Sequence, residues 1–277
     1  MIKTVHIGST LLTNDQRFCT AIRNLAMADI FTSEATKGGF SGRKVIMGKP
    51  QGYTFITEWG IIGTDFSDLA QQRQEFMSLL SEIIDDGEAN IIFTRSDDVQ
   101  LLLNVKSVKV TGDISAQDGN LSRFLVEMKT DYPFLQSNSQ KSENISIFAG
   151  GGWAIPFGIP FDMSAGSVTD VSVENEGNYR AYPILRIYGE LSNPVITNTT
   201  TGEVMNVSGD LATAADYLEI DTFKRTVLLY PAGSNARSMV SGDFITLQKG
   251  INNIRLSNGS STDGKLVLSF RDHYVGI

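Results

Sequence analysis

The chain of 277 residues is long enough for one large β domain or two ordinary ones, and its 41% hydrophobic and 19% charged residues are typical of a globular protein. Its net charge of −8, from 31 acidic and 23 basic residues, argues against DNA or RNA as a ligand. The single cysteine, Cys19, excludes an internal disulfide and a thiolate-based structural zinc site.

Cys19 is interpreted as a small buried hydrophobic residue rather than a nucleophile. The N-terminus, MIKTVHIGSTLLTND, lacks the apolar core of a signal peptide and contains the first predicted strand, with His6 in it. No stretch of about 18 apolar residues occurs in the chain. We therefore expect neither export through a cleaved signal nor insertion into a membrane.

The first half of the chain predicts strands and one helix. Residues 41–48, SGRKVIMG, and 53–62, YTFITEWGII, are strand-like, and DFSDLAQQRQEFMSLLSEIIDDG follows at 65–87. In that segment the helically spaced apolar residues are Leu69, Phe76, Leu80, Ile83 and Ile84. This stripe predicts an amphipathic helix that packs on a sheet.

Both ends of this helix carry the expected signals. Ser67 or Asp68 can cap its start, and Gly87 stands where a left-handed residue ends many helices. Strand patterns resume after Gly87 with ANIIFTR, VQLLLNVKSVKV and LSRFLVEMKT, which are separated by turns rich in Asp, Gly and Asn. The polar segment LQSNSQKSEN, residues 135–144, is the best candidate for a linker. We accordingly expect an N-terminal domain at 1–138 and a C-terminal domain at 139–277.

The second half predicts short strands and no convincing helix. The strand-like segments are SVTDVSVEN, YPILRIYGEL, PVITN, EVMNV, DYLEID, RTVLLYP, DFITLQ, NNIRLS and KLVLSF. Only SGDLATAAD, residues 208–216, could form a helical turn. Short strands with turns between them leave no room for a helical layer, so an antiparallel sandwich is expected.

The clearest pattern of the second half is a strand followed by a hairpin. Residues 183–191 predict one sandwich strand, and residues 193–198 and 203–207 predict the two arms of a hairpin. Gly202 is expected to supply the positive φ at the hairpin turn. None of these side chains suits catalysis, so the segment serves to hold a shape.

Signals for chemistry are weak throughout. The chain contains no P-loop, no HExxH, no GxSxG and no EF-hand pattern. Its two histidines, His6 and His273, stand at opposite ends, and each is interpreted as a surface or interface residue. The paired acids Asp85/Asp86, Asp97/Asp98 and Glu174/Glu176 are interpreted as solvated turn residues rather than glycosidase carboxylates.

The segment AGGGWAIPFGIPFD, residues 149–162, is not a phosphate loop, because its glycines do not open a helix. We interpret it as a bent connection anchored by Trp153, Phe157 and Phe161. We therefore expect no catalytic residue, no cofactor-binding residue and no metal ligand, and the protein is not expected to be an enzyme.

Several segments, taken in their order along the chain, resemble segments of a known protein family. The NEG of residues 175–177, YPILRIYGEL, NPVITNTTTG, YLEID and LQKGINNIRL resemble the C-terminal region of siphophage distal tail proteins, the Dit or phage tail component family. In the first half GRKVIMGKPQGYTF, DFSDLAQQRQEF and DYPFL are similar to the same family, as is IPFGIPFD just upstream of the second half.

This resemblance implies a mainly β fold with one helix: an N-terminal sandwich-like belt domain and a C-terminal galectin-like antiparallel sandwich. It also implies a hexameric ring at the tip of a virion tail, assembled in the bacterial host. Its partners would be the major tail tube protein, the tail-associated lysin or tip protein, and receptor-binding proteins, without nucleic-acid or membrane binding. The sugar-binding residues of true galectins have no counterpart, since Asn193 and Pro194 are followed by Val195.

Two alternatives remain open at this point. A carbohydrate-binding adhesion module would need an exposed aromatic platform, which the second half can draw only from a few Phe and from Tyr179, Tyr182, Tyr188, Tyr217 and Tyr230. A hydrolase would need carboxylates held together in a cleft, which no sequence motif indicates.

Overall fold

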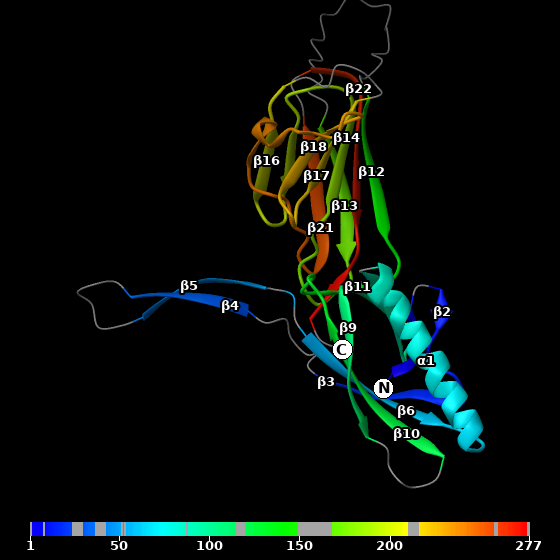
Figure 1. Ribbon diagram of the computed structural model, residues 1–277. Helices are drawn as coiled ribbons and strands as arrows, with labels where there is room; N and C mark the ends of the chain where they lie inside the picture. Colours follow the sequence, from blue (N-terminus) through cyan, green and yellow to red (C-terminus); the bar gives the residue numbers. More distant parts are fainter. Residues whose placement is uncertain are drawn as a thin grey trace, which may run out of the picture. The chain divides into compact units, whose positions relative to one another are not determined.

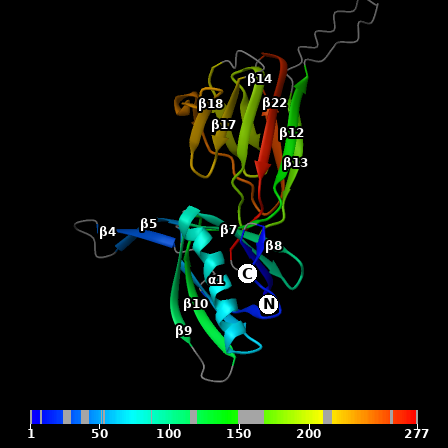
Figure 2. The same ribbon diagram turned by 45° about the vertical axis from the view of Figure 1, so that its right-hand side comes forward.

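The computed structural model describes the chain except residues 1, 8, 24–29, 37–42, 51, 53, 87, 115–119, 149–167, 210–215, 258–259 and 276–277. The chain forms two compact units (Figures 1 and 2): unit 1 comprises residues 1–138 and 274–277, and unit 2 comprises residues 139–273. Residues 274–277 are grouped with unit 1, and Tyr274 packs against the core of that unit. The prediction of a mainly β, antiparallel chain with one helix in its first half is confirmed.

Unit 1 contains a six-stranded sheet and a four-stranded sheet. Across the six-stranded sheet the order is β2 (Thr10–Leu11), β1 (Ile2–Ile7), β7 (Ala89–Arg95), β8 (Gln100–Val105), β11 (Leu135–Ser137) and β23 (His273–Tyr274). Across the four-stranded sheet it is β3 (Arg17–Arg23), β6 (Thr54–Ile62), β10 (Leu121–Lys129) and β9 (Ser107–Ile114). Trp59 of β6 and Phe93 of β7 belong to one buried cluster, so the two sheets share a core.

Helix α1 (Phe66–Asp86) packs on the inner face of the four-stranded sheet, as its apolar stripe predicts. Leu69, Phe76 and Leu80 are all buried. The Phe76 ring lies 5.0 Å from the ring of Trp59 and 6.1 Å from that of Phe124, centre to centre. Figure 2 shows the helix crossing the strands β9 and β10. The side chains of Ile83 and Ile84 and the conformation of Gly87 lie outside the described part of the chain.

The N-cap of α1 differs from the prediction. The helix is capped by Asp65, whose Oδ1 accepts a hydrogen bond from the backbone N–H of Asp68 at 2.8 Å. Asp68 turns back instead and accepts bonds from the Thr64 backbone N–H, the Thr64 hydroxyl and the Gln16 amide. These bonds, first that from the Thr64 backbone, hold the pKa of the Asp68 carboxyl below its usual value. Asp65 thus caps the helix two residues before Ser67, the earlier of the two predicted caps.

Two strands of unit 1 stand apart from both sheets. Strands β4 (Ile30–Thr36) and β5 (Arg43–Pro50) pair with each other as a two-stranded ribbon (Figure 1). Within the described residues this ribbon has no third strand. An isolated ribbon of this kind is marginally stable in water, so it is suited to contact with another surface.

Unit 2 is the predicted antiparallel sandwich. Its six-stranded sheet has the order β12 (Lys141–Phe148), β22 (Ser260–Phe270), β14 (Ile184–Ser192), β17 (Tyr217–Asp221), β18 (Thr226–Tyr230) and β19 (Ser234–Asn235). Its five-stranded sheet has the order β13 (Val168–Asn175), β21 (Gly250–Ser257), β15 (Val195–Asn198), β16 (Glu203–Val207) and β20 (Val240–Gly242). A short 3-10 helix, Arg237–Met239, precedes β20.

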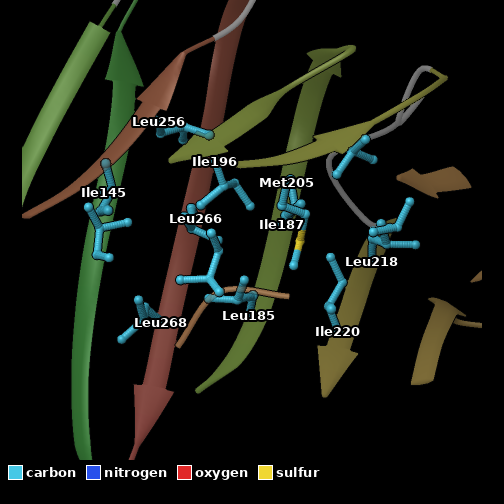
Figure 3. Packing of buried hydrophobic residues seen from close by; sticks show 14 of the residues in the cluster. Ile145, Leu185, Ile187, Ile196, Met205, Leu218, Ile220, Leu256, Leu266 and Leu268 are labelled. Atoms are coloured by element: carbon cyan, nitrogen blue, oxygen red, sulfur yellow. The ribbon is translucent and has the colours of Figure 1, made fainter. Parts of the chain in front are cut away.

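Aliphatic side chains fill the space between these two sheets (Figure 3). Leu185 and Ile187 of β14 and Leu218 of β17 point toward Ile196 of β15 and Met205 of β16, and all five are fully buried. Along β16, β17 and β21 alternate residues contribute to this core, which is the alternation that the sequence displays.

The predicted hairpin is confirmed. Strand β15 pairs with β16 in the register Val195↔Asn206 to Asn198↔Glu203. Gly202 adopts φ +79°, and the space where its Cβ would lie is open. The glycine is therefore required by backbone conformation and not by crowding.

The predicted strand DFITLQ does not form. Its backbone is bound by side chains of other segments: the Thr246 N–H donates to the Glu203 carboxylate at 2.7 Å, and the Thr246 C=O accepts from the Asn198 amide at 2.7 Å. The Asn252 side chain accepts from the Gln248 N–H and donates to the Gln248 C=O. A segment whose polar backbone groups are satisfied in this way needs no strand neighbour.

Two other predictions differ from the structure. The expected linker at 135–144 is mostly strand, since β11 covers its first three residues and β12 begins at Lys141. The segment VQLLLNVKSVKV is interrupted at Lys106, where β8 gives way to β9. The possible helical turn at 208–216 and the connection at 149–162 lie wholly or mainly outside the described residues.

Candidate functional site

Groups with catalytic potential are dispersed in the described residues. Among them no cluster of three or more His, Cys, Asp and Glu side chains is placed to hold a metal ion. Cys19 is mostly buried on β3, and burial is the main cause that raises the pKa of its thiol to about 12. A thiol with that pKa stays protonated at neutral pH and is a poor nucleophile.

His273 is buried, so its interpretation as a surface or interface residue is wrong. Its side chain is nearly inaccessible, its Nδ1 lies 3.0 Å from the Arg180 carbonyl oxygen, and its ring centre lies 5.7 Å from that of Tyr182. Burial lowers the pKa of His273 to about 4. Gly177 packs so closely that a Cβ there would lie 2.2 Å from the His273 carbonyl oxygen. The glycine of the NEG motif is thus explained by its contact with this strand.

The acidic pairs behave as structural residues where the structure describes them. Asp97 and Asp98 lie in the exposed turn after β7, where Asp97 pairs with Arg95 and Asp98 pairs with Lys3. Glu176 and the buried Asp272 both contact Lys141 Nζ at 2.9 Å. Burial lowers the pKa of Lys141, but its hydrogen bonds to the two carboxylates outweigh that effect and raise it. The side chains of Asp85 and Asp86 lie outside the described residues.

Unit 1 has an open hollow of about 530 Å³ on the outer face of its four-stranded sheet. Its apolar surface comes from Phe18, Ile56 and Leu125, while charged side chains from β3, β6 and β10 also line it. Among these, Arg23 and Glu58 form an ion pair with each other. The hollow therefore offers a surface for packing, and no acid–base or nucleophilic pair lines it.

Unit 2 brings together three of the five tyrosines that a platform could use. Tyr188 pairs across the strands with Tyr217, which pairs with Tyr230, and Tyr188 also pairs with Lys265 on its other side. These four residues, here called the tyrosine row, run across β22, β14, β17 and β18, which lie side by side in Figure 2. Because the flanking residues Ile187 and Leu218 point into the core, the row lies on the outer face of the sheet.

The rings of the tyrosine row stack on one another. Tyr188 and Tyr217 have ring centres 5.0 Å apart, and Tyr217 and Tyr230 have centres 4.7 Å apart with planes only 4° from parallel. Lys265 Nζ lies 5.0 Å from the centre of the Tyr188 ring. Most ring faces are therefore covered by a neighbour. Sequence reasoning named these tyrosines as candidates, but only the strand register places them together.

Two further features are the free edges of the four-stranded sheet. Within the described residues, β3 and β9 each pair with one neighbour only. Their outer backbone N–H and C=O groups are available to another strand, as in any exposed sheet edge. Sequence analysis missed this feature because it did not predict β3.

The class of protein follows from a family comparison. Residues 176–274 match the family model of the siphovirus-type tail component, C-terminal domain. This confirms the resemblance on which the sequence analysis drew: residues 176–274 are similar to the C-terminal domain of siphovirus-type tail components. The NEG, YPILRIYGEL and YLEID segments lie within or at the border of this match.

Solved structures extend the likeness to nearly the whole chain. The crystal structure of the SPP1 Dit protein, described as a paradigm of the hub adsorption apparatus in phages that infect Gram-positive bacteria, has a TM-score of 0.60 at 13% identity over 96% of this chain and 97% of that chain. The phage p2 baseplate in its activated conformation matches with TM-scores of 0.43 with Sr, at 12% identity over 96% and 97% of the chains, and 0.42 with Ca, at 13% identity over 97% and 98%. No curated protein matches the chain.

At this identity the likeness to SPP1 Dit establishes the fold. The family match of residues 176–274 supports a structural role in a phage tail and a place in the tail of the virion. A structural rather than enzymatic protein is consistent with the family. Among the described helices, none is long and apolar enough to span a membrane.

Proposed function

We propose that the chain is a hub of a phage tail tip, in which six copies form a ring between the tail tube and the tail-associated lysin or tip protein, and which also carries receptor-binding proteins. Unit 1 forms the belt of the ring, and unit 2 projects from the belt and binds partner proteins.

The observation that carries this proposal is the four-stranded sheet with two free edges. A ring requires a heterologous contact in which one surface of a copy meets a different surface of the next copy. Strands β3 and β9 are two different edges of one sheet, so β3 of one copy can pair with β9 of its neighbour. Strand addition supplies both directional hydrogen bonds and a fixed register.

Oligomeric state tests the ring directly. Light scattering at several concentrations, followed by negative-stain imaging, should reveal a six-membered ring, alone or after addition of the tube and tip proteins encoded nearby. A chain that stays monomeric in all these mixtures contradicts the proposal.

Hydrogen exchange tests the edges. Amides of β3 and β9 should exchange more slowly in the ring than in dilute monomer, whereas amides of the internal strands β6 and β10 should change little. A ring whose β3 and β9 amides still exchange rapidly would show that another surface closes it.

A further inference from the structure

We infer that the tyrosine row, Lys265, Tyr188, Tyr217 and Tyr230, is a docking surface for another tail protein that presents carboxylates. The inference rests on the proposed function, because a hub must hold further proteins. It concerns the outer face of unit 2 and is independent of the edges by which unit 1 would close a ring.

The row presents hydrogen-bond donors that the described chain leaves unused. The hydroxyls of Tyr188, Tyr217 and Tyr230 have no hydrogen-bond partner among the described residues, and Lys265 has no carboxylate partner there. On the adjacent line of the same sheet face, Arg186 is already neutralised by Glu219, with Nε and Oε2 2.7 Å apart. Among the described side chains of these two lines, the charge left without a partner is therefore the positive charge of Lys265.

An acidic partner complements this arrangement. Carboxylates accept hydrogen bonds from phenol hydroxyls and form an ion pair with an ammonium group. The chain has a net charge of −8 and as a whole repels an acidic partner. The positive charge of Lys265 would attract such a partner locally and so direct it to the row.

The stacking favours a protein over a sugar. Sugar recognition on aromatic residues uses exposed ring faces, and in the row most of these faces are turned to a neighbouring ring or to Lys265. Ring edges and hydroxyls remain, which suit the polar and apolar mixture of a protein surface. Tyrosine is enriched at such interfaces.

The row is also ordered before any partner arrives. Each ring is held by a directly opposite residue on the next strand, so little side-chain freedom remains to be lost on binding. A preformed row of this kind contributes to affinity by lowering the entropic cost of association.

Cross-linking identifies the occupant. The full-length chain with Tyr230 replaced by photoreactive benzoylphenylalanine is assembled with the tail proteins encoded beside it, and in a parallel sample with purified host cell-wall polysaccharide. A cross-link to an Asp- or Glu-bearing surface of one of those tail proteins supports the inference. A cross-link to the polysaccharide, a cross-link to a second copy of this chain, or no cross-link to a tail protein overturns it.

Affinity for the cross-linked protein then tests the chemistry. Lys265→Glu and Tyr217→Ala should each weaken binding at least about tenfold, and added salt should weaken the wild type more than Lys265→Gln. The controls are Lys249→Glu, the same charge reversal at an exposed site in a loop, and Phe66→Ala, an exposed aromatic residue of unit 1. Equal losses in variants and controls would contradict a role for the row.

Light scattering separates the two proposals. If the Lys265 and Tyr217 variants still form the ring but no longer bind the cross-linked protein, the inference and the hub function both stand. If these variants form the ring and still bind that protein, the inference fails while the hub function stands. If the wild type never forms a ring, the hub function itself fails.

Discussion

The buried cores of the two units consist of different kinds of side chain. Unit 1 relies on large aromatic side chains, with Phe55, Trp59, Phe76, Phe93 and Phe124 in its buried cluster. In unit 2 the buried cluster is almost wholly aliphatic, with Phe270 as its aromatic member among the described residues. Unit 2 adds buried amides instead: Asn175, Asn198 and Asn252 are fully buried and bind the backbone of loops.

This difference shows in which unit buried polar groups are left unsatisfied. The loops of unit 2 are tied to its sheets by side chains, so their polar groups are satisfied within the unit. Both units have free sheet edges in the described chain, but only unit 1 also has a two-stranded ribbon apart from its sheets. The buried side-chain atoms without a hydrogen-bond partner, among them two guanidinium nitrogens of Arg17, all belong to unit 1 in the described part of the chain.

The largest expected effect comes from the aromatic core of unit 1. Phe76→Ala should lower the free energy of unfolding of unit 1 by about 3 to 5 kcal/mol, because it leaves a cavity beside Trp59 and Phe124. Hydrogen-exchange mass spectrometry in urea should show that strands of unit 1 lose protection early while those of unit 2 do not. Met77→Ala, at an exposed position of the same helix, is the control. Simultaneous loss of protection in both units would refute two separately stable cores.

Acid should act on unit 2 through His273. The folded-state pKa of about 4 lies below the ordinary 6.5, so the unfolded chain binds the proton more readily. The stability of unit 2 is therefore unaffected above pH 6.5 and falls as the pH drops from 6.5 to about 4, by about 3 kcal/mol. Urea unfolding at several pH values should show this slope, and His273→Gln should flatten it.

The matched control for acid is His6→Gln, in unit 1, which should leave the pH dependence of unit 2 unchanged. If His273→Gln keeps the full slope, the carboxylates alone account for the acid sensitivity. That result would remove His273 from the explanation.

The buried amides of unit 2 should give a smaller effect. Asn198→Ala leaves the Thr246 carbonyl and the N–H groups of Thr200 and Thr201 without their side-chain partner, which should cost about 2 kcal/mol. Chemical unfolding of unit 2 measures this cost. Asn206→Ala removes an exposed amide from the same hairpin and should change little. Equal stabilities of the two variants would show that the amide network contributes nothing.

The smallest effect is expected at the hairpin turn. Gly202→Val should lower stability by about 1 kcal/mol or more, since a β-branched residue is strained at φ +79°. Gly202→Asn should cost less, because asparagine tolerates the left-handed region. An unchanged melting temperature of the Val variant would contradict the claim that the backbone conformation at position 202 requires glycine.

Local patterns predicted the elements whose signals lie close together in the sequence. The stripe of Leu69, Phe76 and Leu80 was sufficient for the helix, and alternation plus Gly202 was sufficient for the hairpin. Strand β3 was missed because Arg17 is a buried charge and because a bulge between Cys19 and Ala21 breaks the alternation. DFITLQ was predicted as a strand because its pattern fits one, but its backbone is bound mainly by distant side chains and, at Leu247, by an isolated bridge to Ala181.

The candidate surfaces depend on sequence-distant pairing, which explains why they were only partly predictable. Tyr188, Tyr217 and Tyr230 could be named as aromatic candidates, but their stacking follows from the registers of three strand pairs. Burial of His273 follows from its packing against Gly177 and Arg180, nearly a hundred positions away. The order of segments along the chain was still sufficient to indicate the resemblance to the family. Turn residues and the buried asparagines can be recognised directly in the sequence.

Strand β23 has a consequence for biosynthesis. The six-stranded sheet of unit 1 joins strands from residues 2–137 to β23 at residues 273–274, and the sequence of unit 2 lies between them. The nascent chain therefore cannot finish this sheet until unit 2 has been synthesised. Growing chains on one polysome would thus carry an unfinished sheet in unit 1 for as long as unit 2 is being made.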